Sequence, residues 1–445
     1  MKKVVVFGAG LVAAPLVEYL LGKEDFQVTV ATRTVSKAEK IIGKAPNGEA
    51  VAFTIDQKER LDNLIKEHDL AVSLLPYIHH VTVAKVCLKY GKHLVTTSYV
   101  SDAMRELHKE AKKAGVLFLN ECGLDPGIDH MSAMKIIHEI QNKGGRVASF
   151  TSFCGGLPAP EANTNPFGYK FSWSPRGVLL AGKNSAHFIE NGKEVFIEAK
   201  DLFASYRMMK IDGVGEFEAY PNRDSVPYKD LYGIEDTDTI LRGTLRYPGW
   251  CPTMKIMGDL GFLNEEPLPE LAGKTYRELT AHLIGVQEVK DEKEIRKKVA
   301  EYLGIDFNAR ELDRLEWLGL FSEIPLAEGA DNALDYLCHL MQSKMPYEKG
   351  ERDMIILQHN FVAEYHGGAK KEQIVSTLVE YGTPEGHTAM ARTVGLPAAI
   401  ATKMILNNEI RESGVEIPIK PEIYNPILDE LEKEGIKFEE RKEEM

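Results

Sequence analysis

The sequence predicts an α/β fold that begins with a doubly wound parallel sheet and continues into a second, mixed α/β domain. Over the first 120 residues, apolar segments of strand length alternate with amphipathic segments of helix length, a pattern typical of a parallel sheet covered on both faces. The alternation stops near residue 145, where loops rich in glycine, proline and aromatic residues follow. The chain has 445 residues, 44% of them hydrophobic, which suits two or three domains.

The first strand ends in a glycine-rich turn. An apolar run over residues 4–7 leads into the sequence Gly8-Ala9-Gly10-Leu11-Val12, and a helical pattern starts at Ala13. Gly8 permits a tight turn, Gly10 leaves no Cβ between backbone and ligand, and the small Ala13 lets the helix pack close to the strand. In this strand–turn–helix context the motif predicts a Rossmann-type domain, whose helix N-terminus binds the pyrophosphate of a dinucleotide.

The end of the second strand indicates which dinucleotide is bound. An NAD site usually has an Asp or Glu there, which binds the ribose 2′-hydroxyl. Here the strand ends in Ala31-Thr32-Arg33, without a carboxylate. The guanidinium of Arg33 can bind a 2′-phosphate bidentately and stack on the adenine. We therefore predict NADP(H) as the cofactor; the alternative is that Arg33 is a solvated turn residue.

The next elements continue the alternation. We expect strands at residues 49–55, 69–75, 93–97 and 116–119, and helices at residues 57–66, 80–90 and 101–114. Because ligands of such sheets bind beyond the carboxyl ends of the strands, we expect these ends to converge on one crevice. They carry Asp56, Leu75, Thr97, Ser98, Tyr99 and residues 120–125.

The rest of the chain predicts two further structural regions. We expect a strand at residues 147–153, loops to about residue 260, a strand pair at 353–365 and 373–381, an apolar helix at 387–406, and a solvated helix or frayed end from residue 429. The predicted domains are a dinucleotide-binding domain (residues 1–125 and 387–445), a mixed α/β substrate domain (126–266 and 346–386) and a helical subdomain (267–345).

Composition excludes several classes of partner. The net charge of −13 argues against nucleic acid and against an anionic membrane surface. No apolar run approaches the about 20 residues of a membrane span. Five cysteines without a close pair suit a reducing cytoplasm and argue against structural zinc.

Two alternatives to these predictions stay open. Met1-Lys2-Lys3 before an apolar stretch resembles a secretory signal, although the glycines and Glu18 that follow argue against it. The adjacent His79 and His80 are of a metal-ligating type, although no cluster of ligands surrounds them in the sequence. We expect no metal.

Three residues are candidates for proton transfer or for binding a substrate amine. Asp125 precedes a proline and should lie outside the following helix, where its carboxylate can bind an ammonium group or move a proton. Asp129 is explained equally well as the N-cap of that helix. Cys154 begins a Gly-Gly turn and is either a small buried hydrophobic residue or a proton-transfer group.

Several arginines are candidates for binding carboxylates. Arg176, Arg223 and Arg246 lie in loops or strands rich in glycine and aromatic residues. Thr244 and Arg246 share one face if their segment is a strand. Each arginine alone is more often a surface salt-bridge residue, but several in one domain favour a carboxylate site. The residues therefore predict an NADP-dependent oxidoreductase whose substrate carries carboxylates.

Eight segments spread over most of the chain resemble the saccharopine reductases, the glutamate-forming saccharopine dehydrogenases of lysine metabolism. They are GAGLV (8–12), VSLLPY (72–77), HLVTTSYVS (93–101), GLDPGIDH (123–130), CGGLPAPE (154–161), GYKFSWS (168–174), YPNRDS (220–225) and RGTLRY (242–247). The resemblance implies that glutamate condenses with L-2-aminoadipate 6-semialdehyde and that NADPH reduces the imine to saccharopine, in a homodimer formed by the mixed domain. A related imine reductase, such as carboxynorspermidine dehydrogenase, and a non-catalytic NADP(H) sensor remain alternatives.

The resemblance also implies the residues of the site. Those that would line the cofactor are Gly8, Ala9, Gly10, Leu11, Val12, Ala31, Thr32, Arg33, Asp56, Leu75, Thr97, Ser98, Leu124, Asp125 and Ser174. Those that would contact the substrate are Ser98, Tyr99, Asp125, Arg223, Thr244, Leu245 and Arg246. Asp125, Tyr99 and Cys154 would assist proton transfer. Pro175 replaces a serine of the family pattern and removes a backbone donor beside Ser174.

Overall fold

The computed structural model describes residues 1–445, and the chain divides into two compact units. The first unit comprises residues 1–145, 365–369 and 376–441. The second unit comprises residues 146–364, 370–375 and 442–445. Each is described below by itself.

The first unit is built on a seven-stranded sheet in which every strand pair is parallel. Its strands are β1 (Lys2–Phe7), β2 (Phe26–Thr32), β3 (Gly48–Ala52), β4 (Leu70–Ser73), β5 (His93–Thr96), β6 (Leu117–Leu119) and β15 (Gly414–Glu416). They lie in the order β15-β6-β5-β4-β1-β2-β3. This confirms the predicted doubly wound parallel sheet.

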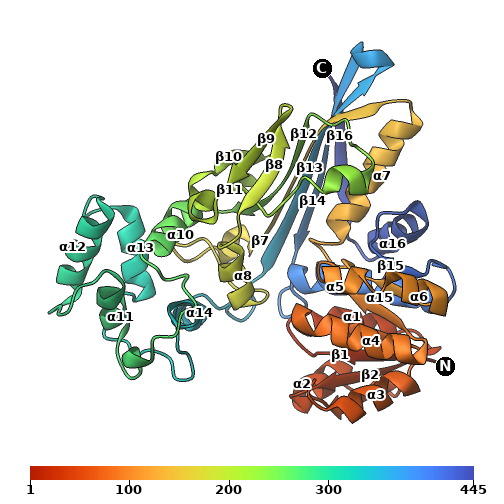
Figure 1. Ribbon diagram of the computed structural model, residues 1–445, viewed down its shortest axis with the longest axis horizontal. Helices are drawn as coiled ribbons and strands as arrows, with labels where there is room; N and C mark the ends of the chain where they lie inside the picture. The colour runs from red at the N-terminus through yellow and green to blue at the C-terminus, as the bar shows by residue number, and fades with distance from the viewer. The chain divides into compact units, whose positions relative to one another are not determined.

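Helices bury both faces of this sheet (Figure 1). They are α1 (Ala13–Leu21), α2 (Val35–Ile42), α3 (Lys58–Glu67), α4 (His80–Tyr90), α5 (Asp102–Arg105), α6 (His108–Ala114), α7 (Ile128–Asn142), α15 (Ala389–Leu406) and α16 (Pro421–Lys433). Val5 and Phe7 of β1 share a core with α3, α4 and α6. Their neighbours Val4 and Val6 point to the opposite face and are equally buried, which explains the unbroken apolar run.

The helix α15 is apolar and long enough, at 18 residues, to cross a membrane, but 78% of it is buried inside the structure. It packs on α1, α16, β4 and β5, so it serves as a core helix. Gly395 lies at the contact with α1, where an added Cβ would stand 2.8 Å from the backbone oxygen of Val12.

The structure differs from the sequence predictions at three places. The helix over residues 101–114 is two helices, α5 and α6. The strand β15 extends the sheet beside β6 and has no counterpart in the predictions. The tail from residue 429 is helical only to Lys433, where α16 ends, and then forms a strand, β16 (Phe438–Glu444), rather than a frayed end. Both strands form through backbone pairing with a sheet edge, which short or charged sequences can do without an apolar pattern.

The second sheet is mixed. Its strands are β7 (Arg146–Pro158), β8 (Ala186–Glu190), β9 (Lys193–Ile197), β10 (Arg207–Ile211), β11 (Gly215–Pro221), β12 (Thr239–Arg246), β13 (Asp353–Tyr365), β14 (Lys370–Tyr381) and β16. The main path is β10-β11-β12-β7-β13-β14-β16, with β8 and β9 attached at β12. The strands β7 and β12 are parallel, and the neighbouring pairs β11–β12 and β7–β13 are antiparallel. The segment expected to be loop-rich therefore contains five strands, β8 to β12.

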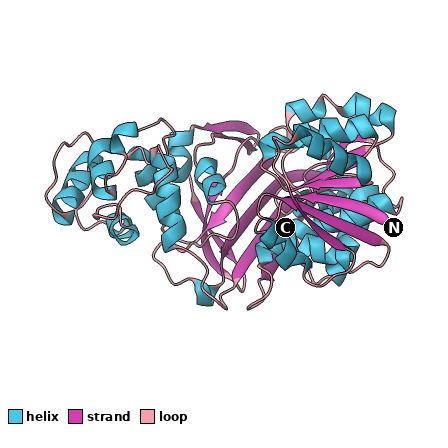
Figure 2. Cartoon of the chain, turned by 90° about the horizontal axis from the view of Figure 1, so that it is seen from below, coloured by secondary structure: helices cyan, strands magenta, loops and turns pink.

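The second unit also contains seven helices. They are α8 (Pro175–Ala181), α9 (Tyr228–Tyr232), α10 (Trp250–Asp259), α11 (Tyr276–Leu283), α12 (Glu292–Leu303), α13 (Arg310–Leu318) and α14 (Ala333–Lys344). The last four form a group of helices without a strand, at the left of the view (Figure 2). Thr275 and Glu278 start α11 with a reciprocal capping box, in which each side chain bonds the other residue's backbone N–H.

Candidate functional site

The turn after β1 requires the two glycines for different reasons. Gly8 has φ +111°, and an added Cβ would stand 3.1 Å from the backbone oxygen of Leu74. A Cβ on Gly10 would meet no protein atom within 4 Å. Gly8 is therefore required by the fold, whereas Gly10 leaves open space at the start of α1. This is the arrangement that brings a pyrophosphate close to the backbone.

The ends of β1 and β2 carry exposed side chains suited to a dinucleotide. Leu11 is 65% exposed, although an apolar side chain gains by burial. Arg33 is exposed at the end of β2 and makes no ion pair or hydrogen bond within the chain. Ala31 is buried and Thr32 is half-buried. With no carboxylate among these residues and an unpaired guanidinium, the site fits NADP(H).

The other predicted cofactor residues of the first unit differ in exposure. Asp56 is exposed, Leu75 and Thr97 are half-buried, and Leu124 is buried. Tyr77 and Ile78, directly after β4, are 72% and 64% exposed. The predictions omitted these two. Their signal in the sequence was an apolar pair immediately beyond a strand end.

Tyr99 and Asp125 form the predicted proton-transfer pair. The Tyr99 hydroxyl donates to Asp125 Oδ1 over 2.8 Å, and both residues are half-buried. Glu121 holds the backbone on either side of Tyr99: its N–H donates to the Ser98 carbonyl over 3.1 Å, and its carboxylate accepts from the Val100 N–H over 2.9 Å. These two hydrogen bonds fix the conformation of the loop that carries Ser98 and Tyr99.

Glu121 is itself held by a buried hydrogen bond to His130 that the predictions missed. Its second carboxylate oxygen lies 2.8 Å from His130 Nε2, and the side chains are 4% and 0% exposed. Such a contact is costly to break, because removing one partner leaves the other polar group buried without its hydrogen bond. Glu121 also has φ +57°, a conformation that is strained for a non-glycine residue.

Asp129 does not cap the helix in the predicted way. The N-cap of α7 is Gly127, and Asp129 is the second residue of the helix. Its carboxylate instead accepts from the Gly127 N–H over 2.6 Å. The carboxylate thus stabilises the turn before the helix and lies near the positive end of the helix dipole.

Ser98 is bonded to a histidine. Its hydroxyl lies 2.9 Å from His80 Nε2, and His80 Nδ1 lies 2.9 Å from the Ser73 hydroxyl. The described residues contain no group of three metal-ligating side chains, and both ring nitrogens of His80 are used by serines. This contact gives His80 a role that its position in the sequence did not indicate.

In the second unit, Arg246 carries a buried charge without an anionic partner. The residue is 6% exposed. Its Nη1 donates to the Leu245 carbonyl over 2.8 Å, while its Nε has no hydrogen-bond partner. The guanidinium carbon lies 5.0 Å from the ring centre of Tyr169 and 5.5 Å from that of Trp250. Because an unpaired buried cation is costly, Arg246 is suited to bind an anionic ligand.

Neighbouring strands place further residues beside Arg246. Thr244 lies two residues before it on the same face of β12, opposite Tyr220 of β11 and Cys154 of β7. Burial raises the pKa of Tyr220 to about 12, so its hydroxyl stays protonated and can donate. Leu245 is fully buried, so only its backbone is available to a ligand.

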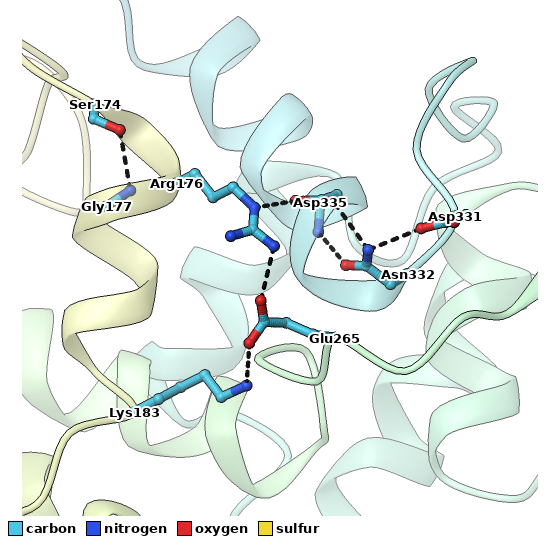
Figure 3. A network of polar contacts seen from close by, with 8 residues as sticks. All are labelled: Ser174, Arg176, Gly177, Lys183, Glu265, Asp331, Asn332 and Asp335. Atoms are coloured by element: carbon cyan, nitrogen blue, oxygen red, sulfur yellow. Dashed lines mark hydrogen bonds and ion pairs between the residues drawn. The ribbon is translucent and has the colours of Figure 1, made fainter. Parts of the chain in front are cut away.

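The other two predicted arginines differ from Arg246. Arg223 is exposed and has φ +58°. Arg176 is engaged in ion pairs, at 2.9 Å to Asp335 and 2.8 Å to Glu265 (Figure 3). Its charge is already compensated, so the salt-bridge alternative is correct for Arg176.

Ser174 acts as the N-cap of α8. Its hydroxyl accepts from the Gly177 N–H over 3.3 Å (Figure 3). Pro175 is the first residue of that helix, where the missing N–H would have no intrahelical partner. The replacement of serine by Pro175 therefore suits the helix start, and Ser174 remains exposed.

Comparison with known proteins covers the whole chain. Residues 4–119 match the family model described as the saccharopine dehydrogenase NADP binding domain, and residues 123–436 match the saccharopine dehydrogenase C-terminal domain. The Schizosaccharomyces pombe protein named saccharopine dehydrogenase [NADP(+), L-glutamate-forming] is 45% identical over 99% of both chains. The Saccharomyces cerevisiae protein of that name is 41% identical over 99% of both chains.

A solved structure and a longer relative agree with this. The apo, histidine-tagged saccharopine dehydrogenase (L-Glu forming) from Saccharomyces cerevisiae superimposes with a TM-score of 0.90 at 40% identity, over 100% of both chains. The mitochondrial alpha-aminoadipic semialdehyde synthase of Bos taurus is 38% identical over 98% of this chain, which covers 47% of that protein. The chain therefore belongs to the saccharopine dehydrogenase family.

Proposed function

We propose that this protein catalyses the NADPH-dependent condensation of L-glutamate with L-2-aminoadipate 6-semialdehyde to saccharopine, and the reverse oxidation, in lysine metabolism. The observation that carries the proposal is the buried, unpaired guanidinium of Arg246, because the substrates and the product are rich in carboxylates. The full-length similarity to NADP-dependent, glutamate-forming enzymes supports the same conclusion.

The reaction needs a carbon–nitrogen bond and a reduction. The glutamate amine attacks the aldehyde carbon, and loss of water leaves an imine. NADPH, when bound, supplies the hydride that reduces the imine carbon, and a proton from solvent completes the amine. The residues that would hold this cofactor are the turn at Gly10, the N-terminus of α1 and Arg33.

The protein's own groups assist the proton transfers. Asp125 and Tyr99 share a hydrogen bond, so a proton accepted by the carboxylate can be exchanged with the phenol. This pair suits the removal of a proton from the attacking ammonium and the protonation of the departing hydroxyl. We assign Cys154 a secondary part in the same transfers, since it lies opposite Thr244 in the sheet.

Carboxylate recognition belongs to the second unit. Arg246 offers the edge formed by Nε and Nη2, which suits a bidentate carboxylate. Thr244 and Arg223 are assigned to other polar groups of the substrate, and Leu245 to a backbone contact. In the first unit, we assign Ser98 to a contact with the bound cofactor and substrate.

We further propose that the enzyme is a cytoplasmic homodimer without a nucleic acid or membrane partner. The net charge of −13 supports the absence of a nucleic acid or membrane partner, the cysteine usage supports the cytoplasm, and the family resemblance implies the homodimer. Light scattering on the eluted peak of a gel-filtration column tests the oligomer: a mass of twice 49.7 kDa is expected, and a monomer at working concentration would contradict it.

The experiment for the activity is a panel of NADPH oxidation assays. Glutamate with the aminoadipate semialdehyde is compared with diamines and polyamine-derived aldehydes, each with and without its partner. We expect turnover only when both natural reactants are present. Activity confined to polyamine substrates would identify a carboxynorspermidine-type enzyme, and tight NADPH binding without turnover would identify a sensor.

A further inference from the structure

A chain of three hydrogen-bonded polar groups in the first unit, two of them buried, ends at Ser98, one of the residues predicted to contact the ligands. Ser73 is the last residue of β4, His80 is the first of α4, and Ser98 follows β5. The two hydrogen bonds, Ser73 to Nδ1 and Nε2 to Ser98, are both 2.9 Å long. Ser73 and His80 are 0% and 5% exposed, so neither can exchange these partners for solvent.

The hydrogen bonds favour one tautomer of the imidazole. The Ser73 hydroxyl has His80 as its only partner. If Nδ1 carried the proton, the hydroxyl hydrogen of Ser73 would stay unpaired in the core, at a cost of about 1–3 kcal/mol. With the proton on Nε2, Ser73 donates to Nδ1, and Nε2 donates to Ser98. Burial supports a neutral ring, because it lowers the pKa of His80 to about 4.

The direction of these bonds decides what Ser98 can do. A hydroxyl has one hydrogen to donate. When its oxygen accepts from His80, that hydrogen is available to a ligand, and Ser98 has no competing side-chain acceptor in the structure. A lone serine could act as donor or acceptor, but this one is oriented as a donor.

We propose that His80 is a positioning residue that makes the Ser98 hydroxyl a fixed hydrogen-bond donor to a carbonyl or carboxylate oxygen of the bound ligands. The proposal rests on the proposed function, because the assignment of Ser98 to the ligand site does. Two groups have the required chemistry: the carboxamide oxygen of the nicotinamide ring and a carboxylate of the amino-acid substrate.

The tautomer of His80 can be determined by NMR, without an activity assay. The full-length enzyme, labelled with 15N-histidine, is examined by NMR from neutral pH down to about pH 5, and the His80 signal is identified by its loss in His80→Gln. We expect a neutral ring with its proton on Nε2 throughout. A proton on Nδ1 would overturn the proposal, because Ser98 would then donate to the histidine.

Binding and kinetics provide the second readout. We compare His80→Leu with His68→Leu, a matched control in the same unit. His68 is also buried, with both ring nitrogens bonded, to the Leu64 carbonyl over 2.6 Å and the Thr29 hydroxyl over 2.8 Å. Both variants should lose stability. Only His80→Leu should weaken ligand binding, by about 3- to 10-fold for one hydrogen bond.

The two ligand sources give different results. A higher dissociation constant for NADPH without substrate indicates the carboxamide. An unchanged NADPH constant with a higher KM for saccharopine indicates the carboxylate. If both constants match those of His68→Leu, the proposal is wrong. The NADPH titration and the NMR measurement remain informative even if saccharopine formation is absent, so failure of the proposed function is distinguishable.

Discussion

In the second unit, the aromatic residues around Arg246 stabilise its buried charge in the absence of an anionic ligand. The guanidinium lies against the faces of Tyr169 and Trp250, which stabilise a cation through their ring quadrupoles. They do not replace a carboxylate, and the Nε of Arg246 stays unpaired. Burial of this unpaired charge therefore destabilises the free protein, and an anionic ligand would offset that cost when it binds.

Replacement of Arg246 by methionine should separate function from stability. We expect kcat/KM for saccharopine to fall by about 10- to 150-fold, the equivalent of about 1.5–3 kcal/mol for a charged hydrogen bond. The free energy of unfolding should stay level or rise, because an unpaired buried cation is removed. Steady-state kinetics and urea denaturation measure the two effects.

The matched control for that variant is Arg176→Met. Arg176 is held by Asp335 and Glu265, so this variant should lose little activity. Equal losses of kcat/KM in the two variants would contradict the assignment of Arg246.

Arg33 should decide between the two dinucleotides. In Arg33→Gln the 2′-phosphate loses its cationic partner, and we expect the KM for NADPH to rise by about 10-fold or more, in line with a charge-assisted hydrogen bond. The KM for NADH should change little. Lys40→Gln, on the exposed side of α2, serves as the control. A parallel rise for both cofactors would show that Arg33 acts on the fold rather than on the phosphate.

His80 should make the enzyme sensitive to acid. Its pKa is 6.5 when unperturbed and about 4 in the folded protein, so below pH 6.5 the unfolded chain binds a proton that the folded chain excludes. The free energy of unfolding should therefore fall between about pH 6.5 and pH 4, by up to about 3 kcal/mol from this group.

Urea denaturation at pH 7 and pH 5 measures this effect. The difference between the two pH values should be smaller in His80→Gln than in the unmodified protein. It should be unchanged in His339→Gln, which alters an exposed residue of α14. An equal pH dependence in all three proteins would rule out His80 as a source of acid sensitivity.

At the scale of elements, the glycine-rich turn after β1 and the start of α1 depend on packing by the helix α15. The helix α15 comes from the far end of the chain and packs on α1, and Gly395 provides the close approach. The position of the α1 N-terminus, which would bind the pyrophosphate, is thus set partly by residues almost 400 positions away in the sequence.

Gly395→Ala tests this support. The new Cβ would lie 2.8 Å from the Val12 oxygen and 3.2 Å from the Leu16 nitrogen, so α1 must move. We expect a loss of about 1–3 kcal/mol in the free energy of unfolding, as for other overpacked contacts, and weaker NADPH binding. Gly258→Ala in α10 is the control, because its nearest neighbour would be 3.8 Å away. Unchanged NADPH affinity in Gly395→Ala would contradict the proposed coupling.

The elements that could be predicted are those with a local apolar pattern. Strands β1, β2 and β4 are buried on both faces, and their continuous apolar runs follow from that burial. The strands β15 and β16 could not be predicted, because their stability comes from backbone pairing with distant partners. The same difference holds at the site. The turn at Gly8 is local and was predictable, whereas the contacts of His80 and Glu121 join residues that only the folded chain brings together.

At the scale of the molecule, each unit has a distinct chemical character. The first carries the open turn, the unpaired Arg33 and the Tyr99–Asp125 pair, which suit a dinucleotide and proton transfer. The second carries the buried Arg246, which suits a carboxylate. An enzyme that reduces an imine between two amino acids needs both kinds of recognition. The family membership and the chemistry of the residues thus lead to the same reaction.

The most direct test of this account follows the hydride. The enzyme is incubated with glutamate, the aminoadipate semialdehyde and NADPH that carries deuterium at both positions of the hydride-donating carbon of its nicotinamide ring, and the products are analysed by mass spectrometry. We predict saccharopine with one deuterium, on the carbon that was the aldehyde carbon. Deuterium in an alcohol formed from the semialdehyde, or no labelled saccharopine at all, would contradict imine reduction as the function of this protein.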